Sequence, residues 1–155
     1  MARDRRSEIG SMRWSEIDFE ACTLNLPRER VKNATAHCVP LSESVTAILL
    51  GLDRGNDDLV FSTTSKPVSG YSKMKARLDA ASGTAGWCLH DLRRTFVTGL
   101  ARLGVDIPVI ERAVNHRSGT FGGVVGTYQR HDYHQEVRAA MELWAAHLAG
   151  LVTGG

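Results

Sequence analysis

The sequence predicts an α+β fold, in which a small antiparallel sheet near the N-terminal half is followed by a mostly helical bundle. Three observations lead to this prediction. Two short β-leaning segments flank a polar turn, most later segments repeat apolar residues at helical spacing, and glycine or proline separates several of them. The chain has 155 residues, so we expect residues 1–155 to form a single domain of ordinary size.

The first segments account for the predicted sheet. Residues 5–13 read as a short helix that ends near Trp14. Residues 22–27 (CTLNLP) and 36–41 (AHCVPL) are β-leaning, and the polar stretch RERVKNAT between them suggests a turn. We therefore expect these two segments to pair as a small antiparallel unit.

Three more elements are predicted before the middle of the chain. Ser42 stands where an N-cap is expected, and an apolar-rich helix follows it to about Leu52. The letters LVFS at 59–62 predict a short strand. Another helix is expected over residues 70–82, where Gly83 would end it.

The second half is predicted to be almost entirely helical. A helix over residues 90–103 is expected to end at Gly104, and Asp106 can cap a helix that begins at Ile107, with Pro108 in its first turn. The first of these helices carries an apolar stripe of Phe96, Leu100 and Leu103. A last helix is expected over residues 133–151, with an apolar face of Val137, Met141, Trp144 and Leu148.

Composition narrows the class of protein. No apolar run approaches the ~20 residues that a membrane-spanning helix needs, and the charged start does not resemble a secretory signal. The cysteines Cys22, Cys38 and Cys88 are odd in number and lack paired C-x-x-C spacing, so we interpret them as reduced thiols of a cytoplasmic protein.

Charge is unevenly distributed along the chain. The net charge is only +2, yet residues 66–130 carry 10 basic and 4 acidic side chains, whereas the flanking segments are each slightly acidic. A basic segment of this kind suits a polyanionic partner if the fold gathers it on one face. A solvated basic surface is the alternative interpretation of charge alone.

The most informative motif is His90-Asp91-Leu92-Arg93-Arg94-Thr95. Helix positions three apart share a face, so His90 and Arg93 should project together, whereas Arg94 should point elsewhere and Leu92 should face the core. A histidine beside an arginine can supply a proton donor or acceptor next to an anion-binding group. The pattern H-x-x-R by itself is common on protein surfaces.

Other chemistry-bearing residues accompany this motif in a fixed order. Arg5 lies near the start, Lys32 lies in the turn between the two β-leaning segments, His116 ends a predicted helix, and Tyr128 follows in TYQR. In this order the chain resembles the catalytic domain of the tyrosine recombinases, the phage integrase family. The words MRWSEID, KNATAHCVPLS and HDLRRTF are also similar to those of prophage and genomic-island integrases. The resemblance implies the catalytic residues Arg5, Lys32, His90, Arg93, His116 and Tyr128.

The resemblance also implies a mechanism that suits these residue types. Arg5 and Arg93 would bind the non-bridging phosphate oxygens, on which charge grows in the transition state. Tyr128 would be the nucleophile, although a phenol with an ordinary pKa of about 10 needs help at neutral pH, for which His90 is the candidate. The covalent 3′-phosphotyrosine would conserve the bond energy, so no cofactor, ATP or metal is expected.

The two remaining residues would assist the same step. Lys32 would protonate the departing 5′ oxygen, and His116 would add a hydrogen bond to the phosphate. The partners implied are double-stranded DNA attachment sites and further copies of the chain in a synaptic homotetramer.

Simpler interpretations exist for individual residues. Arg5 and Lys32 could be solvated surface charges, and His116 could cap a helix C-terminus. Tyr133 is a rival nucleophile five residues after Tyr128. His131 and His134 are three residues apart, but no nearby cysteine or carboxylate completes a metal site.

Family members carry a further helical segment and a DNA-clamping domain before the first arginine, whereas this chain begins almost at Arg5. We therefore expect an N-terminally truncated catalytic domain without the core-binding domain. The alternative hypothesis is an inactive remnant that still binds DNA. A small helical interaction domain with no DNA role is the more remote alternative.

Overall fold

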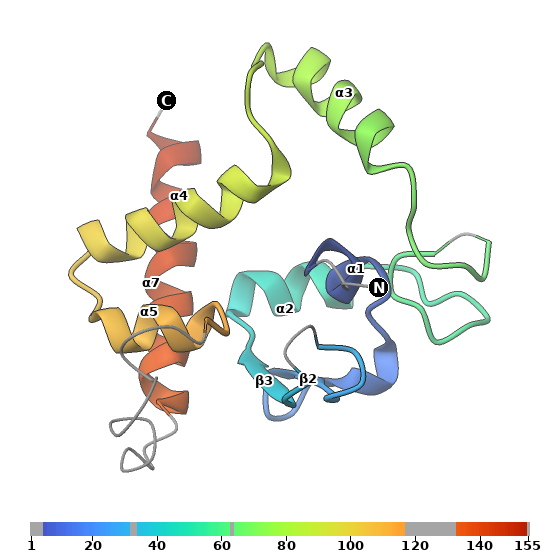
Figure 1. Cartoon of the computed structure of the whole chain (residues 1–155), viewed down its shortest axis with the longest axis horizontal. Coiled ribbons are helices and arrows are strands. Elements are labelled where there is room, and N and C mark those ends of the chain that lie inside the picture. Colours follow the sequence, from blue (N-terminus) through green and yellow to red (C-terminus); the bar gives the residue numbers. More distant parts are fainter. Residues whose placement is uncertain (1–4, 32–33, 63, 117–132, 155) are drawn as a thin grey trace. The chain divides into compact units, whose positions relative to one another are not determined.

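A computed structural model describes the chain except for residues 1–4, 32–33, 63, 117–132 and 155. The chain divides into two compact units, each described below by itself: the first unit is Met1–Val39 with Val45–Leu89, and the second is Pro40–Ser44 with His90–Gly155. The described residues form six α-helices, one 3-10 helix and a three-stranded sheet (Figure 1). This content confirms the predicted α+β class.

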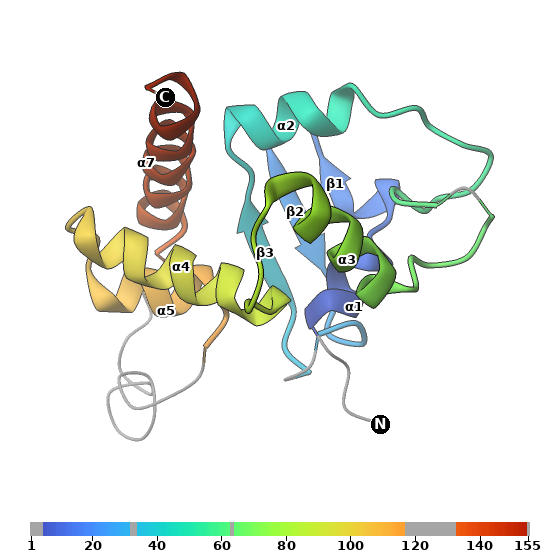
Figure 2. The same cartoon turned by 90° about the horizontal axis from the view of Figure 1, so that it is seen from above.

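The first unit is built on the sheet, whose order is β1-β2-β3 (Figure 2). The 3-10 helix η1 (Trp14–Glu16) follows helix α1 (Arg5–Gly10) and leads into β1 (Ile17–Asp18). Strand β1 runs antiparallel to β2 (Thr23–Leu26), with Ile17 opposite Leu24, and β3 (His37–Pro40) completes the sheet. The two predicted β-leaning segments are thus β2 and β3, whereas the two-residue β1 was too short to predict.

The predicted strand at 59–62 is wrong, because only one bridge forms there. Leu59 pairs with Arg13 as an isolated antiparallel bridge, and the Val60 N–H donates to the Met12 carbonyl at 2.9 Å. The chain enters η1 directly after Arg13. The partner segment is therefore no longer extended after Arg13, and further strand pairing with residues 59–62 cannot form.

The two helices predicted around this bridge are present. Helix α2 (Glu43–Leu50) begins directly after Ser42, and helix α3 (Tyr71–Ser82) ends at Gly83. Gly83 has φ +65°, a left-handed conformation that glycine adopts without steric cost. The glycine therefore stops α3 where the sequence predicts.

Three helices form the core of the second unit: α4 (Leu89–Arg102), α5 (Ile107–Ala113) and α7 (His134–Thr153) (Figure 1). Gly104 adopts φ +83° between the first two, and Asp106 occupies the N-cap position of α5, although its side chain makes no capping hydrogen bond. The buried residues that pack together are Leu100, Val109, Ile110, Ala113, Val137 and Ala140. Apolar periodicity thus predicted α4 and α7 correctly, and Asp106 with Pro108 predicted the start of α5.

One glycine sets the approach of α4 to α7. A Cβ atom added to Gly99 would lie 2.2 Å from the Trp144 ring. The same ring meets Phe96 edge to face, with centroids 5.6 Å apart. Because real Cβ atoms cannot approach a ring so closely, a larger residue at position 99 would push the indole away.

The expectation that Leu92 faces the core is wrong, since its side chain is 58% exposed. Leu92 lies in the first turn of α4, whereas the residues of α4 that pack against the core begin one turn later, at Phe96. Helical periodicity alone cannot tell where along a helix its neighbours begin.

Candidate active site

His90 and Arg93 lie one turn apart near the start of α4, as their spacing predicts. His90 is exposed, whereas Arg93 is half-buried. Asp91 in the first turn is favourable there because a helix N-terminus carries partial positive charge. The start of α4 therefore presents an imidazole and a guanidinium on one turn.

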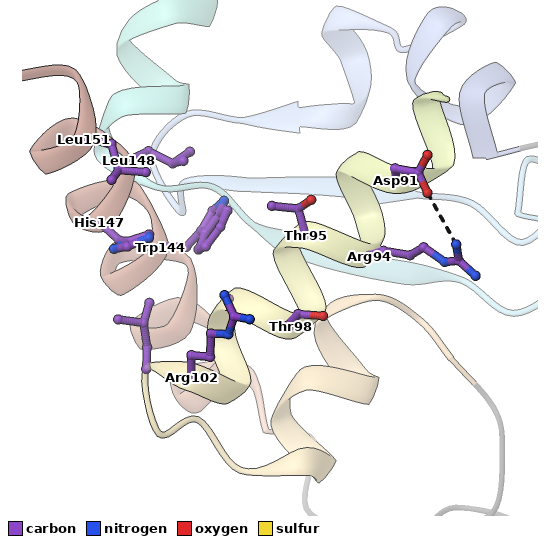
Figure 3. A pocket seen from close by; sticks show the side chains of 11 residues that line it. Asp91, Arg94, Thr95, Thr98, Arg102, Trp144, His147, Leu148 and Leu151 are labelled. Atoms are coloured by element: carbon purple, nitrogen blue, oxygen red, sulfur yellow. Dashed lines mark hydrogen bonds and ion pairs between the residues drawn. The ribbon is translucent and has the colours of Figure 1, made fainter. Parts of the chain in front are cut away.

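Arg94 belongs to a different surface. Its guanidinium lies 3.5 Å from the Asp91 carboxylate, and both residues line a groove between α4 and α7 (Figure 3). The groove measures about 520 Å³, and neither His90 nor Arg93 lines it. The prediction that Arg94 points away from the His90 and Arg93 pair is consistent with this arrangement.

His116 is fixed by the way α5 ends. Asn115 adopts φ +48°, its N–H donates to the Arg112 carbonyl at 3.0 Å, and the His116 N–H donates to the Glu111 carbonyl at 2.8 Å. These two bonds form a Schellman motif, which satisfies carbonyls at the helix end. Asparagine is one of the few residues other than glycine that enter the left-handed region at low cost. Asn115 therefore directs the backbone that carries His116.

The His116 side chain is accessible and has an acidic neighbour. Its Nδ1 atom lies 3.8 Å from Glu111 Oε1, with the His116 side chain 53% exposed and the Glu111 side chain 16% exposed. The contact is an ion pair only when the imidazole is protonated. His116 thus lies in the second unit with His90 and Arg93, and all three can be reached by solvent.

The remaining predicted site residues fall partly or wholly outside the description. Arg5 is the first residue of α1 in the first unit, and its side chain is not described. Lys32 and Tyr128 lie outside the described residues. Their roles remain predictions.

Tyr133, the rival nucleophile, is described and lies at the N-cap of α7. It adopts φ +57°, is half-buried and packs against the core of the second unit. Of the histidines considered for a metal, His134 begins α7, and His131 lies outside the description. The described part of the chain holds no group of three or more histidine, cysteine or acidic residues suited to a metal ion.

The structure adds one residue that the sequence analysis left within a polar turn. Arg30 precedes Lys32 by two residues, and its side chain is only 15% exposed because it binds α1 and η1. Its residue type and its polar surroundings in RERVKNAT are shared by Arg28, whose side chain is 75% exposed. The one signal in the sequence is the apolar Val31 that follows it.

Comparison with known proteins gives a consistent picture. Residues 4–135 match the model described as "Phage integrase family". The chain is 32% identical to prophage integrase IntA of Escherichia coli K12 over 145 residues, which are 91% of this chain and 35% of that protein. It is 28% identical to the integrase of Shigella phage Sf6 over 155 residues, 91% of this chain and 37% of that protein.

A third relative extends the same pattern. The chain is 31% identical to prophage integrase IntZ of Escherichia coli K12 over 157 residues, which cover 97% of this chain and 38% of that protein. The chain thus spans well under half the length of these curated relatives. No solved structure matches it. In the residues that the structure describes, no helix is long and apolar enough to cross a membrane.

Proposed function

This chain belongs to the phage integrase family, and we propose that it carries the catalytic part of a site-specific DNA recombinase. The reaction is cleavage and rejoining of double-stranded DNA at attachment sites through a covalent 3′-phosphotyrosine. The observation that carries this proposal is the family match over residues 4–135. All six residues of the signature fall within it: Arg5, Lys32, His90, Arg93, His116 and Tyr128.

The arginines and His116 stabilise charge on the phosphate. A phosphodiester gains negative charge on its non-bridging oxygens as the fifth bond to phosphorus forms, and guanidinium groups bind such oxygens in a forked geometry. Arg93 on α4 suits this role because it is half-buried and its turn also carries His90. Arg5 supplies the second guanidinium, and His116 donates a further hydrogen bond.

Two proton transfers accompany the step. The Tyr128 hydroxyl oxygen attacks phosphorus, and His90 accepts the phenolic proton. The bond between phosphorus and the 5′ oxygen breaks, and the Lys32 ammonium gives that oxygen its proton. Because the new phosphotyrosine bond replaces a phosphodiester, the reverse step needs no ATP.

The distribution of charge supports DNA as the partner. The 10 basic side chains between residues 66 and 130 outnumber the acidic ones by six, and α4 with its flanks lies in this stretch. Cationic surfaces bind the phosphate backbone with strong dependence on salt. Assembly into a synaptic homotetramer on two attachment sites completes the proposal.

The test is covalent capture on DNA. Genomic DNA fragments would be incubated with the chain, and the mixture would then be denatured. The fragments that stay attached to the protein would be sequenced. A nicked suicide duplex would be designed from those sequences. Wild type and Tyr133→Phe should form a denaturation-resistant adduct with this duplex in EDTA, and Tyr128→Phe should form none. Tyr133→Phe is the matched control, because it removes a second phenol five residues away.

Other outcomes identify the alternatives. An adduct that survives Tyr128→Phe but not Tyr133→Phe would move the nucleophile to Tyr133. Salt-sensitive DNA binding without any adduct would support the inactive DNA-binding remnant. No DNA affinity even at low salt would contradict a role on DNA.

A further inference from the structure

Two arginines in the connection between β2 and β3 have opposite surroundings. The Arg28 side chain is 75% exposed and pairs with its neighbour Glu29, at 3.0 Å. The Arg30 side chain is 15% exposed and reaches two other segments of the first unit. Arg30 therefore links segments of the first unit, which a solvated surface charge such as Arg28 does not do.

Arg30 binds both α1 and η1. Its Nη1 atom pairs with Glu16 Oε2, and its Nη2 atom donates to the Glu8 carbonyl at 2.6 Å and to Ser11 Oγ at 2.9 Å. The guanidinium therefore lies at the C-terminal end of α1, where helix carbonyls lack partners within the helix and a cation is favoured.

The acceptors of Arg30 are themselves held in place. Glu16 is 8% exposed, and its Oε2 atom also accepts the Arg13 N–H at 2.9 Å. The Ser11 hydroxyl donates to the Ser7 carbonyl at 2.5 Å. A guanidinium can bind acceptors in several directions at once from one rigid plane, which the compact ammonium of lysine cannot do.

The backbone around Arg30 is also held, by two turn hydrogen bonds and by the burial of Val31. The Arg30 N–H donates to the Pro27 carbonyl at 2.9 Å, and the Val31 N–H donates to the Arg28 carbonyl at 3.3 Å. Val31 is itself only 5% exposed. Lys32 is the residue that follows Val31 in the sequence.

We propose that Arg30 is a positioning residue, which ties the segment that bears Lys32 to the helix that bears Arg5. This inference rests on the proposed function, in which Lys32 protonates the 5′ oxygen while Arg5 binds the phosphate. Arg30 touches neither DNA nor the reacting atoms in this role. It acts by fixing the backbone that directly precedes Lys32.

A change of leaving group separates this role from a structural one. In ordinary DNA, the Tyr128 oxygen bonds to phosphorus, the bond to the 5′ oxygen breaks, and that oxygen takes a proton from Lys32. In a 5′-bridging phosphorothiolate, a sulfur replaces the 5′ oxygen and departs as a thiolate, which needs no proton. A defect confined to proton donation therefore disappears with the sulfur substrate.

The test compares adduct formation by the full chain on matched oxygen and sulfur suicide duplexes. The variant is Arg30→Met combined with Glu16→Gln, so that no lone charge is left buried, and Arg28→Met is the matched control. Because a general acid contributes about 10²–10⁴-fold, we expect the double variant to slow on the oxygen duplex about tenfold or more beyond its loss on the sulfur duplex. Lys32→Ala should show the same selectivity, and Arg28→Met should show none.

Equal losses on both duplexes, or no loss at all, would overturn the positioning role. A wild-type chain that forms no adduct with either duplex would contradict the proposed function, and the positioning role with it. Amide hydrogen exchange at Arg30 and Val31 tests the contacts of Arg30 independently of catalysis. Faster exchange in the Arg30→Met and Glu16→Gln double variant but not in Arg28→Met would show that Arg30 holds this segment, even in a chain that forms no adduct with DNA.

Discussion

Both units of this chain bury apolar side chains, such as Leu24 and Leu49 in the first and Leu100 in the second, but the first unit also relies on buried polar contacts. In the first unit, directional polar contacts link segments that are far apart in sequence, such as Arg30 with Glu16 and Asp58 with Ser15. In the second unit, three helices bury apolar side chains against one another around Leu100, which is 0% exposed. Burial is non-directional and tolerates repacking, whereas a polar contact holds one geometry or fails.

The difference predicts how each unit should respond to substitution. Loss of an apolar group in the second unit should lower stability without moving the helices far. Loss of a charged partner in the first unit should leave another charge buried and displace the segment that it held. Four substitutions test this contrast, in order of decreasing effect.

Leu100→Ala should cost the most, about 3–4 kcal/mol of unfolding free energy, because it removes a fully buried side chain and leaves a cavity. Urea unfolding followed by circular dichroism measures the loss, and hydrogen exchange should place it in α4, α5 and α7. A loss below about 1 kcal/mol, or faster exchange mainly in the sheet, would contradict the apolar account of the second unit.

Arg30→Met should cost about 3 kcal/mol, because the Glu16 carboxylate then lies buried without its cation. Adding Glu16→Gln should restore most of this loss, since the lone charge is gone. The same unfolding assay applies, with faster exchange expected around β1 and β2. If the double variant were no more stable than Arg30→Met, the buried charge would not be the cause.

Gly99→Ala should cost about 2 kcal/mol, because the added methyl meets the Trp144 ring at 2.2 Å. Gly150→Ala is the matched control in α7, where an added Cβ meets no atom of the described residues beyond its immediate helix neighbours within 4 Å. That control should gain about 0.5–1 kcal/mol from the better helix propensity of alanine. Changes of the same sign at both glycines would contradict the packing described at Gly99.

Asp58→Asn should have the smallest effect, a small loss of stability at neutral pH that shrinks as the pH falls. The Ser15 hydroxyl and then the Ser15 N–H donate to Asp58, and with the nearby Arg13 they lower the pKa of that carboxyl below its ordinary value. A carboxyl with a lowered folded-state pKa stabilises the fold above its unfolded pKa and loses that contribution as pH falls through the folded value. Stability measured from pH 5 downward should therefore fall less steeply in Asp58→Asn. Identical slopes would contradict the contact.

The same contrast explains what could be predicted from the sequence. Helices α4 and α7 and the stop at Gly83 follow from apolar periodicity and from glycine at left-handed positions, which are local properties. The pairing of Leu59 with Arg13 depends on segments 46 residues apart, and local sequence does not report where such a pairing ends. The first unit was accordingly predicted less completely.

The candidate site also contains both kinds of residue, some that local sequence predicts and some that depend on contacts distant in sequence. His90 and Arg93 share a turn because their spacing is helical, so the sequence sufficed for that pair. The difference between Arg28 and Arg30 arises from contacts with α1 and η1, which no local pattern encodes. The roles of Lys32 and Tyr128 remain predictions that rest on family membership.

The most direct test of the central claim is to identify the residue that becomes joined to DNA. The adduct formed on a suicide duplex would be digested with nuclease and trypsin, and the modified peptide would be sequenced by mass spectrometry. We predict that the nucleotide remnant lies on Tyr128, attached through a 3′ phosphate. A remnant on Tyr133 or on any other residue, or the absence of an adduct from a folded chain that binds DNA, would contradict the account.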